Sequence, residues 1–161
     1  MPNTVKLKNY SDIMVEYTAS EAISPGMLVE PVPSAATIRK HATESGNAIP
    51  MFAVENELEG EGITTAYASG DKLQVWIPGR GDVVYAQVED EQNIAIGNFL
   101  ESNGAGYLQV HIAPSADSAQ DDISYTGQII GQALEALDLT SLSAAGSSDT
   151  PARQFLRVRI M

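Results

Sequence analysis

Residues 72–88, which read KLQVWIPGRGDVVYAQV, decide the fold class of this chain. On each side of the central PGRG segment, hydrophobic residues alternate with other residues, and a period of two is typical of a half-buried β-strand. Leu73, Val75 and Ile77, for example, share one face of the first segment. Proline and glycine are turn formers. The pattern therefore predicts two strands joined as a β-hairpin.

Shorter segments of the same character lie on both sides of this stretch. Each combines apolar residues with flanking glycine, proline or polar turn residues. They are residues 13–18, 27–30, 37–41, 50–54, 94–100, 107–112, 127–137 and 155–160. Ser24-Pro25-Gly26 has the order of a tight turn, because proline presets its own φ and glycine accepts a positive φ. Residues 127–137 also fit helical spacing, but two glycines weaken a helix there, and a strand is favoured.

Short strands at regular intervals with little helix predict an all-β protein, either a small barrel or a sandwich. A chain of 161 residues, of which 43% are hydrophobic, can form one hydrophobic core. It is too short for two domains of usual size. We therefore expect a single β-rich domain over residues 13–161. Residues 1–12 lack turn signals and a compact apolar cluster, and we expect them to form an extended N-terminal arm.

Charge is unevenly distributed along the chain. The formal net charge is −12, from 21 acidic and 9 basic side chains. Residues 41–150 contain 17 acidic and two basic side chains, a net charge of −15, whereas residues 151–161 contain three arginines and no acid. An acidic body repels phosphate, so no nucleic-acid partner is expected. No apolar run approaches the ~20 residues of a membrane helix, and the N-terminus lacks the apolar stretch of a secretory signal.

Few residues are suited to catalysis or metal binding. The chain has no cysteine and two histidines, His41 and His111, neither with a second histidine at ligand spacing. Neither a nucleophile elbow nor a phosphate-binding P-loop occurs. The alternating glutamates of residues 55–61 lack the loop pattern of a calcium site. Arg80-Gly81-Asp82 spells a cell-adhesion tripeptide, but its turn context explains these residues. We expect no enzyme activity, no catalytic residues, no metal and no cofactor.

Four short motifs resemble those of the head decoration, or cement, proteins of tailed bacteriophages. Residues 18–29, TASEAISPGMLV, resemble the early turn of that family, in which an alanine and a hydrophobic residue precede Ser/Thr-Pro-Gly. The other three are GDKLQV at residues 70–75, IAIGNFLE at residues 94–101 and GQALEA at residues 131–136. Together the resemblance spans about residues 15–160.

This resemblance implies a fold, a location and a partner. The fold would be a β-tulip or small β-barrel, made in the host bacterial cytoplasm and carried on the outer surface of the virion head. Copies would bind there as homotrimers at threefold and local threefold capsomer junctions. Their partner would be a major capsid protein of the HK97-type fold, and they would stabilise the head against the pressure of its DNA, with neither nucleic acid nor membrane as a partner.

The resemblance also implies which residues make the contacts. In this family the N-terminal arm typically reaches along the shell and adds a strand to capsid loops, which uses main-chain hydrogen bonds for affinity. The candidate arm residues here are Val5, Lys6, Leu7, Lys8 and Tyr10. Charge gives a second set of candidates, because a basic end on an acidic body can contact an acidic partner. The candidate subunit or capsid contacts are Arg153, Arg157 and Arg159.

Two other functions are open at this point. A virion-associated module that binds carbohydrate or the host surface would use exposed aromatic residues, for which the candidates are Tyr67, Trp76, Tyr85 and Tyr107. A small β-barrel hydrolase would need carboxylates that converge on a pocket.

Overall fold

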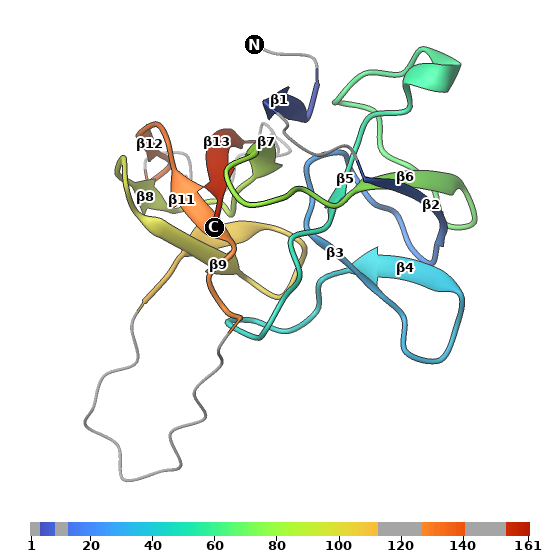
Figure 1. Cartoon of the computed structure of the whole chain (residues 1–161), viewed down its shortest axis with the longest axis horizontal. Helices are drawn as coiled ribbons and strands as arrows, with labels where there is room; N and C mark the ends of the chain where they lie inside the picture. Colours follow the sequence, from blue (N-terminus) through green and yellow to red (C-terminus); the bar gives the residue numbers. More distant parts are fainter. Residues whose placement is uncertain (1–3, 9–12, 113–126, 141–153) are drawn as a thin grey trace, which may run out of the picture.

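The computed structural model describes residues 4–8, 13–112, 127–140 and 154–161. In these ranges the chain forms β-strands and a single 3₁₀ turn, η1 (Glu57–Glu59). The all-β prediction is confirmed. Figure 1 shows two main sheets side by side, one containing β7, β9, β11 and β13, the other β2 to β6.

The first sheet has six strands, all antiparallel to their neighbours. In spatial order they are β1 (Lys6–Lys8), β7 (Val83–Gln87), β13 (Phe155–Ile160), β11 (Gly131–Ala133), β9 (Phe99–Ser102) and β10 (Leu108–Val110). A single bridge from Val88 to Leu108 links the end of β7 to β10. The described strands do not close into a barrel, which corrects the barrel form of the prediction.

The second sheet has five strands, in the order β3 (Val29–Pro31), β4 (Thr37–Lys40), β2 (Met14–Ala19), β6 (Lys72–Trp76) and β5 (Phe52–Ala53). Strands β2 and β4 are parallel, and the other pairs are antiparallel. A two-stranded ribbon joins β8 (Asn93–Ile94) to β12 (Leu137–Asp138).

The hairpin predicted over residues 72–88 is wrong, although both of its strands exist. Strand β6 pairs with β2 and β5, whereas β7 pairs with β1 and β13 in the other sheet. Asp82 redirects the chain between them, because its carboxylate accepts the Gly79 N–H at 2.7 Å and its carbonyl accepts the Ile160 N–H at 2.9 Å. The linker is thus bound to β13 and leads from one sheet into the other.

Turns also divide two of the predicted strands. Residues 94–100 become β8 and β9 around a turn in which Gly97 has φ 90°. Residues 127–137 contain β11 and the start of β12, and no helix. The Pro25–Gly26 turn is confirmed, with φ 84° at Gly26 and a hydrogen bond from Met27 N–H to the Ser24 carbonyl at 3.2 Å.

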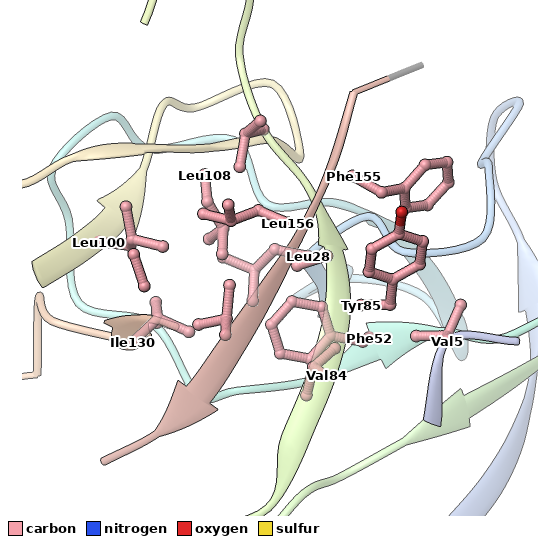
Figure 2. Close-up of a cluster of buried hydrophobic side chains, with 14 of the residues drawn as sticks. Val5, Leu28, Phe52, Val84, Tyr85, Leu100, Leu108, Ile130, Phe155 and Leu156 are labelled. Carbon is pink, nitrogen blue, oxygen red and sulfur yellow. The ribbon is translucent and has the colours of Figure 1, made fainter. Parts of the chain in front are cut away.

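Two hydrophobic clusters form the core. The larger lies between the sheets and includes Phe52, Trp76, Val84 and Leu156, some of which are drawn in Figure 2. The smaller packs on the five-stranded sheet and includes Leu73 and Val75, with others such as Ile23 and Ile38. Strand β6 therefore contributes to both clusters. Leu73 and Val75 on one face give the segment its alternation, whereas Trp76 on the other face joins the larger cluster.

Candidate functional site

The expected N-terminal arm, residues 1–12, contains a residue that belongs to the core. Val5 is fully buried beside Tyr85, whose N–H donates to the Val5 carbonyl at 2.7 Å (Figure 2). The Val5 N–H donates to Glu55 Oε2 at 2.9 Å, and the Glu55 side chain is itself buried. Val5 is therefore part of the folded domain, and the expectation that it belongs to a separate arm is corrected.

Strand β1 lies at the edge of the six-stranded sheet. Lys6 pairs with Val84 and Lys8 with Val83, and Leu7 is half-buried against the larger core cluster. Among the described strands β1 pairs only with β7, so its other edge has no strand beside it. Tyr10 lies outside the described residues. That these residues bind a capsid stays a prediction.

Two of the three candidate arginines lie on β13, two positions from β1 in the same sheet. Arg157 forms an ion pair with Glu135, with 2.9 Å between Nε and Oε2, and its own N–H donates to Oε1 of that carboxylate at 2.9 Å. Arg159 is exposed, and no described residue forms an ion pair with it. Arg153 lies outside the described residues. The fold thus places the arm candidates of β1 and both described arginines on one sheet, on either side of β7.

The aromatic residues proposed for carbohydrate binding do not form an exposed platform. Tyr67, Trp76 and Tyr85 are 3%, 0% and 8% exposed, and Tyr107 is half-buried. The Tyr67 hydroxyl donates to the Val54 carbonyl at 2.9 Å, and burial raises its pKa to about 12. Burial also raises the pKa of Tyr85, which stacks on Phe155 with 4.9 Å between ring centroids. These rings are used for packing.

His41 is held inside the protein by hydrogen bonds to both ring nitrogens. Nδ1 lies 2.7 Å from Ser102 Oγ, and Nε2 lies 3.2 Å from the Asn47 carbonyl. Because a carbonyl only accepts, Nε2 carries a proton and the Ser102 hydroxyl is free to donate to Nδ1. A serine beside a histidine is also found in hydrolases, but a nucleophile must reach its substrate, and Ser102 is fully buried.

His111 contacts the buried carboxylate of Glu101, which also accepts a hydrogen bond from Ser45 Oγ at 2.6 Å. The carboxylate lies between the serine and the histidine, whereas nucleophile activation needs the histidine in the middle. Among the described residues, no group of three or more acidic or histidine side chains has the geometry to hold a metal ion. No helix in these ranges is long and apolar enough to span a membrane.

The sequence did not predict a strongly acidic pocket on the five-stranded sheet. This acidic pocket has a volume of about 320 Å³, and four of the residues that line it are carboxylates: Glu16, Glu59, Glu61 and Asp71. Lys72, Leu58 and Tyr67 also line it. Its carboxylates come from β2, from the loop around η1 and from the loop before β6, so only the strand register brings them together.

Glutamates 55–61, which look like one run in the sequence, have different environments. Glu55 is buried against Val5, whereas Glu59 and Glu61 line the acidic pocket. The adhesion tripeptide is likewise divided, since Asp82 is fully buried while Arg80 is exposed. Its carboxylate therefore stabilises a turn and is not presented to a receptor.

Comparison with known proteins finds a likeness of fold among solved structures. No protein-family model and no curated protein sequence matches the chain. Among solved structures, the fold is similar to the N base of head fiber gp8.5 of bacteriophage phi29. The TM-score is 0.55 at 14% sequence identity, and the match covers 94% of this chain and 95% of the other. The two proteins therefore share an all-β fold over nearly their full lengths.

Proposed function

We propose that this protein is a structural component of a bacteriophage virion that decorates the outside of the icosahedral head and stabilises it. The observation that carries this proposal is the likeness to a head fiber base over 94% of the chain. The turn and strand motifs that resemble head decoration proteins support it independently, because they were identified without the fold. In this proposal the chain is non-enzymatic and has no cofactor.

The proposed partner is a major capsid protein of the HK97-type fold, bound where capsomers meet at threefold and local threefold positions. The edge of β1 opposite β7 has no described strand beside it and is suited to such a contact, since an added strand would extend the six-stranded sheet through main-chain hydrogen bonds. The buried Val5 side chain and the hydrogen bond from the Val5 N–H to Glu55 anchor the residue before β1 in the core. A capsid strand would therefore pair with β1 without pulling it out of the sheet.

Stabilisation then follows from mass action and multivalency. A homotrimer at a junction would bridge several capsid subunits, and rupture of the head would have to break several linked contacts at once. Binding only to the assembled head stabilises that state by about RT ln(1 + [L]/Kd). No bond-making chemistry is needed.

Cosedimentation with expanded heads that lack the protein tests this function. We expect saturable binding of the purified chain and a higher temperature of DNA release from decorated heads. Absence of binding would overturn the proposal.

A pair of charge reversals tests the β1 contact. Lys6→Glu changes the charge at the sheet edge and should weaken head binding by about tenfold, the scale of a charge contact at an interface. Arg80→Glu makes a similar reversal on the exposed loop between β6 and β7 and should bind like the unmodified protein. If Lys6→Glu also binds heads normally, the charge of Lys6 is not part of the head contact.

A further inference from the structure

At Arg159, no described element covers the side of β13 that lies opposite the buried residues Leu156, Val158 and Ile160. Along β13, Leu156, Val158 and Ile160 are buried, whereas Arg157 and Arg159 are exposed. Directly paired residues of antiparallel strands project to the same side of a sheet. The strand therefore presents its arginines on the side opposite Leu156, Val158 and Ile160, and on that side their β7 partners Tyr85 and Val83 are buried.

Strand register identifies the rest of this surface. Arg159 pairs with Val83 on one side and Gln132 on the other, and Gln132 pairs with Phe99. Phe99 is 41% exposed, which is unusual for an aromatic ring on a sheet. We call the surface formed by Arg157, Arg159, Gln132 and Phe99 the β13 face. Arginine and aromatic residues are enriched at protein interfaces.

Charge on the β13 face is opposite to that of the acidic pocket. Glu135 offsets Arg157, but no described carboxylate forms an ion pair with Arg159. In the acidic pocket four carboxylates surround one lysine, and Lys72 lies 3.8 Å from Glu16. Glu59 and Asp71 accept hydrogen bonds from their own loops, while no described side chain bonds Glu61.

Apolar groups match as well. Leu58 lines the acidic pocket and is 83% exposed, and Phe99 lies one strand from Gln132 on the β13 face. In contact, these side chains would exclude water around an arginine–carboxylate pair and strengthen it.

We propose that a second copy of this chain docks its acidic pocket on the β13 face, with Arg159 of one subunit paired to Glu61 of the next. The number of subunits rests on the proposed function, which requires a trimer. The two surfaces lie on different sheets of each subunit, so the contact is heterologous. Such a contact forms a closed ring, as a trimer requires, when the rotation between neighbouring subunits closes, and an open filament when it does not. A face-to-face dimer would place Arg159 against Arg159, and like charges there repel.

Reciprocal charge reversal tests the pairing. The molar masses of Arg159→Glu, Glu61→Arg and the double variant are measured by light scattering after size-exclusion chromatography. The unmodified protein should have three times the 17.1-kDa chain mass. Each single variant should associate about tenfold more weakly, and the double variant should recover the trimer because the pair is rebuilt with reversed signs.

Matched controls carry the same charge changes elsewhere. Arg80→Glu and Glu44→Arg alter exposed residues outside both surfaces and should remain trimeric. Circular dichroism and thermal unfolding of every variant establish that each one folds.

Each result has a defined meaning. A monomer or a dimer of the unmodified protein, unchanged association of both single variants, or failure of the folded double variant to recover the trimer would each overturn this inference. The head-binding assay is read separately. A trimer that fails to bind heads overturns the proposed function alone, whereas head binding by a protein that never trimerises overturns only the inference drawn here.

Discussion

At the scale of a single residue, ionisation of Tyr67 makes the free energy of unfolding depend on pH in the alkaline range. Burial, with smaller contributions from the nearby carboxylates of Glu55, Glu61 and Glu59, raises its pKa from 10.0 to about 12. Between pH 10 and 12 the unfolded chain loses this proton while the folded protein keeps it, so the free energy of unfolding falls as pH rises. Tyr67→Phe cannot lose a proton there. We expect its melting temperature to decrease less between pH 9 and pH 11 than that of the unmodified protein, and equal decreases would contradict this.

Glu55 is the residue whose sequence context is most misleading. It lies among solvent-facing glutamates, yet it is 3% exposed and accepts the Val5 N–H. Glu55→Ala removes that acceptor and leaves a buried donor unsatisfied, which costs about 1–3 kcal/mol.

Urea unfolding measures this cost, with Glu55→Gln as the matched control because it keeps an acceptor of similar size. We expect Glu55→Ala to be clearly less stable than Glu55→Gln. Equal stabilities would show that the hydrogen bond to Val5 contributes little.

At the scale of the element, β1 is a structural strand as well as a proposed contact. Val5→Ala should destabilise the protein by about 2 kcal/mol, since two buried methyl groups are lost. Deleting residues 1–12 removes Val5 and β1 together and leaves the Tyr85 N–H and the Glu55 carboxylate without these partners. We expect the deletion to be at least as destabilising in thermal unfolding. A truncated protein of unchanged stability would show that β1 is not needed for the fold.

For the whole molecule, the net charge of −12 predicts that salt increases stability. Like charges repel in the compact state, and ions screen this repulsion over a Debye length of about 10 Å at 0.1 M. Raising NaCl from about 10 mM to about 100 mM should increase the melting temperature by about 2–4 °C, or roughly 1 kcal/mol for a chain of this size. Arg159→Glu is the best variant for this measurement, because subunit association then contributes least to the melting temperature. A melting temperature independent of salt would contradict the prediction.

Part of the proposed site could be identified from the sequence. The basic residues near the C-terminus and the apolar residues near the N-terminus stand out in composition, and the fold places them on one sheet. The glutamates of residues 55–61 stand out in the sequence, but the acidic pocket could not be predicted from them, because Glu16 is separated from Glu61 and Asp71 by more than forty positions.

The sequence alone determined where β6, β7 and β13 form and where the chain turns at Gly26, because side-chain alternation and backbone preference are local properties. Only the tertiary structure decided which strands are neighbours. Alternation defines the faces of a strand and not its partner, so β6 and β7 resemble a hairpin in sequence yet lie in different sheets. Pairing is selected by burial of distant segments in a common core, and residues 5 and 55 meet for that reason.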